Sequence, residues 1–311
     1  MLRKISFLFV IIFVFSMKPT LCQESAPPRN VISKTVIGDC DVYVLQDSTG
    51  EFDNKVFANA ATEVLKEIAP TGKTPNACNV FLVKYDGKNV LIDTAFGKNL
   101  LTNLNALSVE PKDISAVLIT HSHGDHVGGL LKDGNRFFPN AEIYASETEV
   151  AFWKESNARQ FEQVQKAYGE VKKFTTDEKT SVVLPVIHPL AMPGHTPGHT
   201  GFLIGTGKER LFVAGDLLHS GAIQFSHPEI CASFDKDISQ AVETRRAMLN
   251  RTVEEGWFFT AVHLRIPAVG TVKKAGDGFW FVPQEKDNTI VFGESENKGI
   301  EILAPPNIPA L

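Results

Sequence analysis

The chain has 311 residues, of which 43% are apolar, so it can bury a sizeable core as one large domain or two small ones. Its formal net charge is -5, and no basic run stands out. These features argue against a nucleic-acid partner, because a phosphate backbone is bound mainly through clustered lysine and arginine side chains.

The N-terminus differs in character from the rest of the chain. Two basic residues precede a mostly apolar run over residues 5–17, and polar residues follow it. The run is shorter than the roughly 20 apolar residues that a membrane-spanning helix needs. The pattern predicts a secretory signal peptide over residues 1–22, export to the periplasm or the medium, and a mature domain over residues 23–311 without a membrane-spanning segment. Lipidation of Cys22 is the alternative, which the bulky residue before it disfavours.

Six short apolar segments predict β-strands. They cover residues 42–45, 79–83, 89–92, 116–119, 211–214 and 257–262. Asp86 and Gly87 lie between the second and third segments, and this dipeptide is a strong signal for a tight β-hairpin. The last segment is expected to be the final strand of the domain.

Two helices are predicted in the second half of the chain. Ser146 and Glu149 have the spacing of a capping box, which indicates a helix that begins there and runs towards Gly169. A second helix is expected over residues 239–255, with Gly256 as its stop. Because strands and helices alternate and hairpins come early, the pattern favours an α/β sandwich over an all-parallel sheet.

Three cysteines remain after the predicted signal peptide, namely Cys40, Cys78 and Cys231. An odd number allows at most one internal disulfide bond, and Cys40 with Cys78 is the candidate pair in an oxidising compartment. The alternative is three buried thiols that pack as small apolar side chains.

Chemically reactive side chains follow the predicted strands directly. His121, Asp216 and His263 each stand at or just after a strand end, where residues distant in sequence can meet on one rim of a sheet. In the segment after the fourth strand, His121 and His123 point to the same side of an extended backbone. Asp125 and His126 follow directly. Imidazole nitrogens and carboxylate oxygens are ligands that zinc prefers, so this spacing predicts a metal site.

A turn-rich segment over residues 192–199 presents His195, and an isolated Asp216 follows the next apolar strand. The order of these motifs, ending in the late His263, resembles the metallo-β-lactamase superfamily. The resemblance implies a four-layer αββα sandwich and two Zn²⁺ ions that hold a hydroxide between them. It also implies that one ion is bound by His121, His123 and His195, the other by Asp125, His126 and His263, and that Asp216 bridges both.

Within that superfamily the chain most resembles N-acyl-homoserine lactonases and methyl parathion hydrolase. The bridging Asp216 replaces the Cys or Ser of true β-lactamases, which disfavours β-lactams as substrates. The supporting segments surround Asp39, Phe152, Leu217, Gln224 and Pro267. In the last of these, Arg265 departs from the usual pattern. The resemblance favours a zinc-dependent lactonase with a small-molecule substrate, and an organophosphate triesterase is the alternative.

The resemblance also suggests roles beyond metal binding. His219 stands where the lactonases commonly have a substrate-binding Tyr, so it is a candidate hydrogen-bond donor to a carbonyl oxygen, with a packed His as the alternative. Asp125 is the candidate proton shuttle to the leaving alkoxide. Trp153 and Phe161 are the candidate substrate contacts, although aromatic residues at helical spacing are more often part of a core.

Other residues near these motifs are expected to support the site or to be structural. Asp93 is expected to support a metal ligand, and the remaining histidines are expected to be structural: His188, His199 and His227. A non-catalytic metal-binding protein and an iron-dependent redox protein are the alternatives from other functional classes. A homodimer is a candidate assembly.

Overall fold

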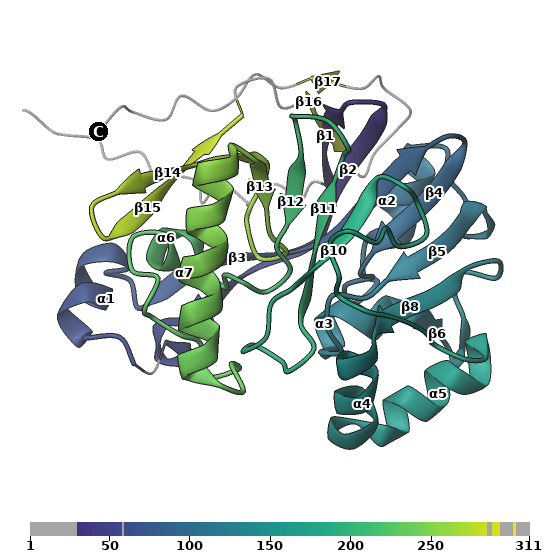
Figure 1. The fold of residues 1–311 in the computed structure, drawn as a ribbon, viewed down its shortest axis with the longest axis horizontal. Coiled ribbons are helices and arrows are strands. Elements are labelled where there is room, and N and C mark those ends of the chain that lie inside the picture. Colours follow the sequence, from purple (N-terminus) through teal and green to yellow (C-terminus); the bar gives the residue numbers. More distant parts are fainter. Residues whose placement is uncertain (1–29, 58, 285–287, 293–300, 303–311) are drawn as a thin grey trace, which may run out of the picture.

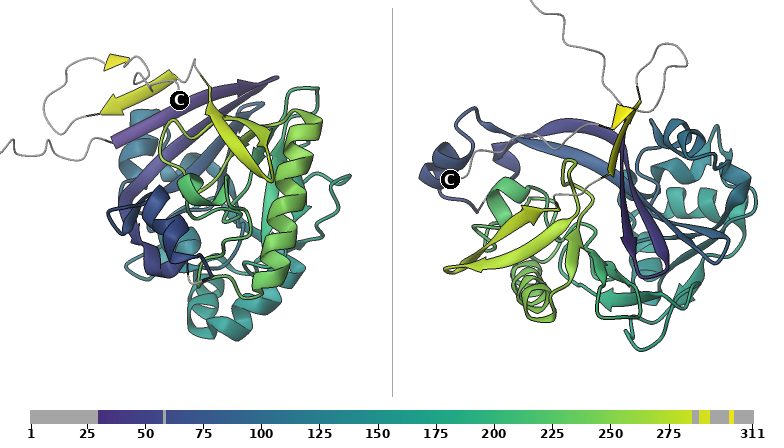
Figure 2. Two further views of the ribbon diagram at one scale, coloured as in Figure 1. Left: turned by 90° about the vertical axis from the view of Figure 1, so that its left-hand side faces the viewer. Right: turned by 90° about the horizontal axis from the view of Figure 1, so that it is seen from above.

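The computed structural model describes residues 30–57, 59–284, 288–292 and 301–302, and two β-sheets packed face to face form its centre (Figures 1 and 2). The predicted signal peptide and Cys22 lie outside the described residues. The first sheet has the order β17-β16-β1-β2-β3-β4-β5-β8-β9. Its strands are β1 (Asn30–Ile37), β2 (Cys40–Asp53), β3 (Lys73–Tyr85), β4 (Lys88–Ile92), β5 (Ile114–Leu118), β8 (Glu142–Ser146), β9 (Lys172–Phe174), β16 (Asn288–Phe292) and β17 (Glu301–Ile302).

The second sheet has the order β10-β11-β12-β13-β14-β15. Its strands are β10 (Ile187–Ala191), β11 (Thr200–Ile204), β12 (Leu211–Val213), β13 (Phe258–Thr260), β14 (Gly270–Ala275) and β15 (Gly278–Pro283). The segment over residues 257–262 is therefore not the final strand, as we expected from the sequence, because β14 and β15 extend the same sheet beyond it. A separate pair of short strands consists of β6 (Leu131–Lys132) and β7 (Asn135–Arg136).

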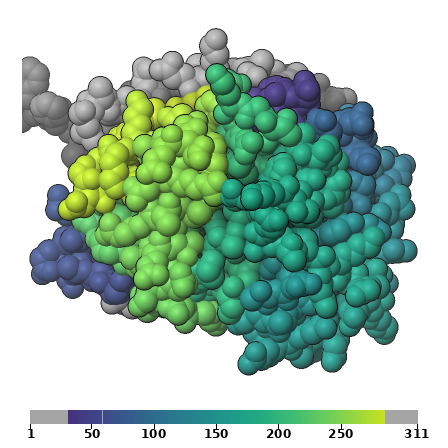
Figure 3. Space-filling model, viewed as in Figure 1, coloured from purple at the N-terminus to yellow at the C-terminus, as the bar shows by residue number. Residues whose placement is uncertain are grey.

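Helices cover the outer faces of both sheets. The α-helices are α1 (Thr62–Ile68), α2 (Leu100–Ala106), α3 (Gly124–Val127), α4 (Glu147–Ser156), α5 (Ala158–Tyr168), α6 (Gly221–Gln224) and α7 (Ile238–Glu255). Three 3₁₀ turns span Asn54–Val56, Pro111–Asp113 and Gly128–Leu130. Helix α7 contacts the second sheet, and α2 and α4 contact the first. In the space-filling view, α7 lies at the surface of that face, with the yellow residues of β14 and β15 visible beside it (Figure 3). The expected four-layer sandwich is confirmed.

Local sequence signals account for several of these elements. Asp86 and Gly87 both have positive φ angles, of 48° and 71°, as a tight turn between β3 and β4 requires. Helix α7 begins after Asp237, whose side chain accepts a hydrogen bond from the Gln240 N–H, and it ends at Gly256 in the left-handed conformation. These two features agree with the sequence-based expectation.

The predicted helix after Ser146 is in fact two helices. The backbone leaves the helical conformation at Asn157, which closes α4 and whose side chain caps α5 by accepting from the Gln160 N–H. Ser146 caps α4 as expected, but the Glu149 side chain does not complete the capping box. It turns inward instead, because three buried donors are within reach there.

The core lies between the two sheets and beneath the helices. Large side chains from both sheets are fully buried there, including Phe81, Phe202, Phe212 and Phe259. Burial of this apolar surface is the main stabilising contribution to the fold. Cys40, Cys78 and Cys231 are buried free thiols, which supports the alternative of three packed thiols over a disulfide between Cys40 and Cys78. None of the helices in the described part of the chain combines the length and apolar character that crossing a bilayer requires.

Candidate metal centre

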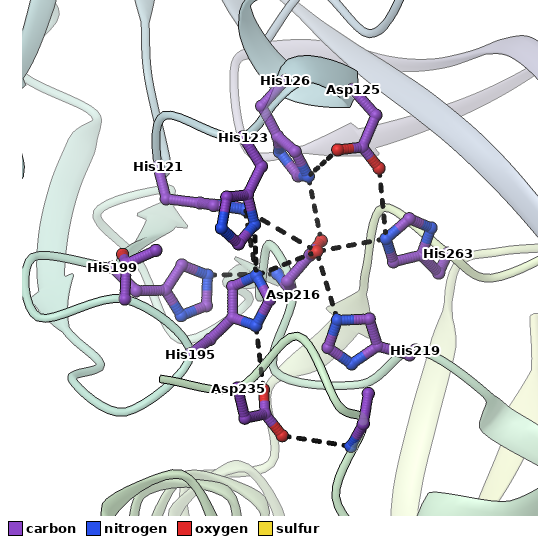
Figure 4. Close-up of polar contacts among 12 residues, drawn as sticks. His121, His123, Asp125, His126, His195, His199, Asp216, His219, Asp235 and His263 are labelled. Carbon is purple, nitrogen blue, oxygen red and sulfur yellow. Dashed lines mark hydrogen bonds and ion pairs between the residues drawn. The ribbon is translucent and has the colours of Figure 1, made fainter. Parts of the chain in front are cut away.

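The predicted ligands meet where strands of both sheets end. His121 follows β5 of the first sheet, whereas Asp216 and His263 follow β12 and β13 of the second. The short helix α3 begins immediately after His123 and carries Asp125 and His126 back towards the same point. Figure 4 shows the side chains of all these residues pointing toward one another. Segments far apart in the sequence therefore build one buried cluster.

The first group consists of His121, His123 and His195. His121 Nε2 lies 3.0 Å from His123 Nδ1, and His195 Nε2 lies 3.1 Å from His121 Nε2 and 2.9 Å from His123 Nδ1. Three imidazole nitrogens thus face a single point. This arrangement could hold one metal ion.

The second group consists of Asp125, His126, Asp216 and His263, whose ligand atoms also lie within reach of one ion. Asp216 Oδ2 is 3.1 Å from His263 Nε2, and Asp216 Oδ1 is 3.1 Å from His126 Nε2. Asp216 Oδ2 also lies 3.4 Å from His195 Nε2 in the first group. The Asp216 carboxylate therefore lies between the two groups, as a bridging ligand would.

The chemistry of the donor atoms fits divalent metal ions. His126 Nε2 and Asp216 Oδ1 are buried and make no hydrogen bond within the described structure, which leaves their lone pairs free for a cation. Burial and the neighbouring His195 lower the pKa of His123 to about 4, so its ring is neutral near pH 7. Burial acts to raise the pKa of Asp216, but His263 and His126 hold it well below its usual range. Neutral imidazole and ionised carboxylate are the forms that bind zinc.

Further groups orient two ligand rings of the second group, those of His126 and His263. Asp93 Oδ2 lies 2.7 Å from His126 Nδ1, in agreement with the expected supporting role of Asp93. The His263 ring pairs its Nδ1 with the Ala77 carbonyl oxygen at 2.8 Å. These contacts direct the Nε2 atom of each ring toward the cluster.

Asp235 orients His195 and was not identified from the sequence. Its Oδ1 lies 2.8 Å from His195 Nδ1, and its Oδ2 lies 3.5 Å from the buried guanidinium of Arg245. Burial acts to raise the pKa of Asp235, but the hydrogen bond to His195 and the nearby His219 and Arg245 hold it at about 2. Asp235 lies in a loop without a recognisable motif, so no local signal distinguishes it.

His219 lies at the edge of both groups. Its Nε2 is 3.4 Å from Asp216 Oδ2, and its ring stacks on that of His263 with the centroids 5.4 Å apart. The ring is buried, and neither nitrogen makes a hydrogen bond in the described structure. Phe52 and Phe234 contact this ring edge-on and at a tilt, with centroid distances of 6.4 and 5.6 Å. Neither phenylalanine was predicted, because each reaches the site only through the tertiary fold.

The predicted substrate contacts lie in the core. Trp153 is 0% exposed and Phe161 is 4% exposed, and their rings pack against each other with centroids 5.4 Å apart. Trp153 donates its indole N–H to Gln160. Neither side chain is accessible to a substrate in this conformation, so their placement supports the alternative of core packing.

The three remaining histidines differ in position. His199 is buried beneath the cluster, where its Nε2 accepts a hydrogen bond from the Asp216 N–H. His188 and His227 contact Glu178 and Glu229 away from the cluster. A structural role therefore fits all three, and His199 additionally fixes the backbone of a ligand.

The comparisons with known proteins agree with this geometry. The model of the metallo-beta-lactamase superfamily matches residues 74–255. The uncharacterized protein YobT of Bacillus subtilis is 27% identical over 163 residues, which make up 48% of this chain and 69% of YobT. Metallo-beta-lactamase domain-containing protein 1 of Xenopus laevis is 33% identical over 135 residues, which make up 41% of this chain and 49% of that protein. The match thus spans only about half the length of the frog protein.

Two solved structures are similar over most of the described chain. The hydrolase AbOPH of the beta lactamase superfamily superposes with a TM-score of 0.73 at 27% identity, and AidC, a dizinc quorum-quenching lactonase, superposes with a TM-score of 0.75 at 25% identity. Each comparison covers 82% of this chain and 98% of the other. With its two sheets and its clusters of His and Asp ligands, the chain belongs to the metallo-beta-lactamase superfamily of metal-dependent hydrolases.

Proposed function

We propose that this protein is a dinuclear zinc lactonase that opens the ring of N-acyl-homoserine lactones. The observation that carries the proposal is the position of Asp216, whose carboxylate faces both ligand groups and has the ring of His219 beside it. The similarity to AidC over 98% of that lactonase supports the same substrate class.

The donor set divides into two groups that each fit one Zn²⁺ ion. His121, His123 and His195 would hold the first, and the second would be held by Asp125, His126, Asp216 and His263. Zinc ions at these positions would supply an activated water molecule and polarise the carbonyl of the substrate. The mature domain without its predicted signal peptide would contain both ions.

Two side chains of the chain itself are suited to assist ring opening. His219 is buried, but unlike Trp153 and Phe161 it lies beside Asp216 and has both ring nitrogens free of hydrogen bonds in the described structure, so it could donate to a carbonyl oxygen that is held at the metal centre and gains negative charge. Asp125 is 25% exposed, and its Oδ2 lies 3.6 Å from His263 Nε2. From this accessible position its carboxylate could take up the proton that the attacking water releases and pass it to the leaving alkoxide.

An apolar pocket adjoins the ligand cluster. It has a volume of about 430 Å³, reaches His263, and is lined mainly by apolar and aromatic side chains, among them Leu264, Ile266, Phe225, Trp280 and Phe281. Such a lining suits the acyl chain of a lactone, because burial of that chain removes apolar surface from water. Phe52 and Phe234 contact the ring of His219 and could contact the lactone ring.

Side-by-side kinetics would test the proposal. The purified, zinc-loaded protein should hydrolyse an acyl-homoserine lactone with a higher kcat/KM than an aryl ester or an aryl phosphotriester. A preference for the phosphotriester would favour the organophosphate triesterase instead. No turnover of any of the three, with zinc bound, would contradict the lactonase proposal.

Export remains part of the proposal as well. The predicted signal peptide over residues 1–22 would direct the protein to the periplasm or the medium. Expression of the full-length chain, followed by fractionation and N-terminal sequencing, should find a protein that begins near residue 23 outside the cytoplasm. An uncleaved protein in the cytoplasm would contradict export.

A further inference from the structure

Glu149 is a fully buried carboxylate that does not belong to either ligand group. Its Oε1 accepts hydrogen bonds from the Ser122 N–H at 2.8 Å and from the Ser122 hydroxyl at 2.7 Å. Its Oε2 accepts a hydrogen bond from the Thr196 hydroxyl at 2.6 Å. Both oxygens are thus engaged by the protein interior.

The partners of Glu149 are neighbours of metal ligands in the chain. Ser122 lies between His121 and His123, and Thr196 directly follows His195. One carboxylate therefore connects the two segments that supply the three ligands of the first group. A backbone hydrogen bond from the Thr200 N–H to the Thr120 carbonyl oxygen, at 2.9 Å, also joins these two parts of the chain, but Glu149 connects them at the residues next to the ligands.

The first turn of α4, which carries Glu149, packs against the loop that carries His195. Ser146 accepts the Glu149 N–H and donates its own hydroxyl to the Gly198 carbonyl at 2.9 Å. A Cβ atom at Gly198 would overlap the backbone of Glu149, so only glycine allows this close approach. The loop that carries His195 thus lies directly on the helix start that carries Glu149.

The charge of Glu149 also bears on metal binding. Its hydrogen-bond donors, Ser122 and Thr196, are neutral, and burial raises the pKa of Glu149 while these hydrogen bonds act in the opposite direction. Its position in the first turn of α4 favours a negative charge only modestly. A divalent cation at the first group would stabilise the ionised carboxylate, and by reciprocity the carboxylate would favour the cation.

We propose that Glu149 is a positioning residue that sets the affinity of the first group for its metal ion through Ser122 and Thr196. The inference rests on the metal pair of the proposed function. Supporting contacts to metal ligands typically change metal affinity by about 10–100-fold. The effect should be confined to the first group, because the contacts of Glu149 do not involve Asp125, His126 or His263.

Three variants separate the effect of the hydrogen bonds that Glu149 makes from the effect of its negative charge. Glu149→Ala removes both. Glu149→Gln removes the charge but can keep both contacts, because its amide oxygen can accept from Ser122 while its NH₂ donates to the Thr196 hydroxyl. Thr196→Val removes only the contact to the His195 segment. Glu147→Gln is the matched control, because Glu147 lies in the same helical turn and is exposed.

The test is the release of zinc from the loaded protein to a chromophoric chelator. In Glu149→Ala, one of two ions should dissociate about 10–100-fold more readily than in the wild type, and Thr196→Val should show a smaller shift in the same direction. Zinc-edge anomalous scattering from crystals should place the weakened ion at the first group. Glu149→Gln should lie between Glu149→Ala and the wild type, and Glu147→Gln should match the wild type.

Two results would overturn the inference. One is that Thr196→Val and Glu149→Gln both bind their two zinc ions as tightly as the wild type does. These two variants keep most of the buried contacts and should fold, which circular dichroism would verify. The other is equal weakening of both ions, which a general loss of structure would produce. A wild-type protein that binds no zinc would instead contradict the proposed function itself.

Discussion

Two buried carboxylates, Asp93 and Glu149, support the two halves of the metal centre (the first and the second ligand group) in different ways. In the second group, Asp93 contacts the ligand His126 directly at 2.7 Å. In the first group, Asp235 contacts the ligand His195 directly at 2.8 Å, whereas Glu149 hydrogen-bonds to Ser122 and Thr196, the chain neighbours of the ligands. Asp93 orients the ring of one ligand, whereas Glu149 connects the two backbone segments that carry Ser122 and Thr196. Glu149 is thus connected to both segments that carry the three first-group ligands through residues next to those ligands.

Strain and burial accompany the direct support. Asp93 is fully buried and has a φ of 61°, which is uncommon for a residue other than glycine. Its Oδ1 accepts from the Thr120 N–H and its Oδ2 accepts from the Thr120 hydroxyl, at 2.8 and 2.7 Å. The backbone conformation at Asp93 thus holds a carboxylate where β5 ends and the ligand segment begins. Such local strain is tolerated where the surrounding contacts determine the conformation.

The largest effect is expected at the residue that the two halves share. Asp216→Asn should lower kcat/KM for the cleaved substrate by about 1000-fold, because the carboxylate that we propose as a ligand to both ions loses its charge, and each 1.36 kcal/mol of lost stabilisation costs tenfold. Metal analysis should find fewer than two zinc ions per chain. Glu155→Gln, an exposed change, is the control. Two tightly bound ions and full activity in Asp216→Asn would mean that the two halves do not share this ligand.

A smaller loss is expected at the boundary between the halves. His219→Phe should lower kcat by about 100-fold while both ions stay bound, because a hydrogen-bond donor to the carbonyl oxygen is lost and the ring volume is kept. Steady-state kinetics together with metal analysis would measure this. His227→Phe, away from the cluster, is the matched control. Loss of one ion instead would show that His219 belongs to the ligand set.

Removing the direct support should weaken the second group more than the first, because Asp93 contacts the second-group ligand His126 itself but reaches the first group only through Thr120, which precedes His121. In Asp93→Asn, the amide can keep only part of the contacts to His126 and Thr120, so zinc at the second group should bind about 10–100-fold more weakly. Chelator competition should show that Asp93→Asn weakens zinc binding mainly at the second group, whereas Glu149→Ala weakens it at the first group. If both variants weakened the same ion, the division into two separately supported halves would be wrong.

The smallest effect is expected at the second support of the first group. Asp235→Asn keeps an acceptor for His195 Nδ1 but loses the charge that faces Arg245, so we expect about tenfold weaker zinc binding at the first group. The same competition assay measures it, with Asp237→Asn as a nearby control outside the cluster. If Asp235→Asn lost as much zinc affinity at the first group as Glu149→Ala does, Asp235 would be at least as important a support of that group as Glu149.

Much of the site could be predicted because its signals are local. The spacing of His121, His123, Asp125 and His126 follows a buried strand, and the alternation of the strand decides which side chains point the same way. Asp86 and Gly87 similarly determine their turn through backbone preferences that depend on two residues alone. The supporting role of Asp93 was inferred in the same way, from a carboxylate at a strand end.

Other features depended on the tertiary structure. Ser146 caps α4 as local spacing predicts, yet Glu149 leaves the capping box because buried donors from two distant segments compete for it. The burial of Trp153 and Phe161 likewise follows from where α4 and α5 pack.

The sequence by itself thus determined which residues could bind metal and where turns and helix caps form, since these depend on spacing within a few residues. Only the tertiary structure decided which buried carboxylates support those ligands. The free energy of a buried charge depends on the donors and cations around it, and the fold brings these together from distant parts of the chain.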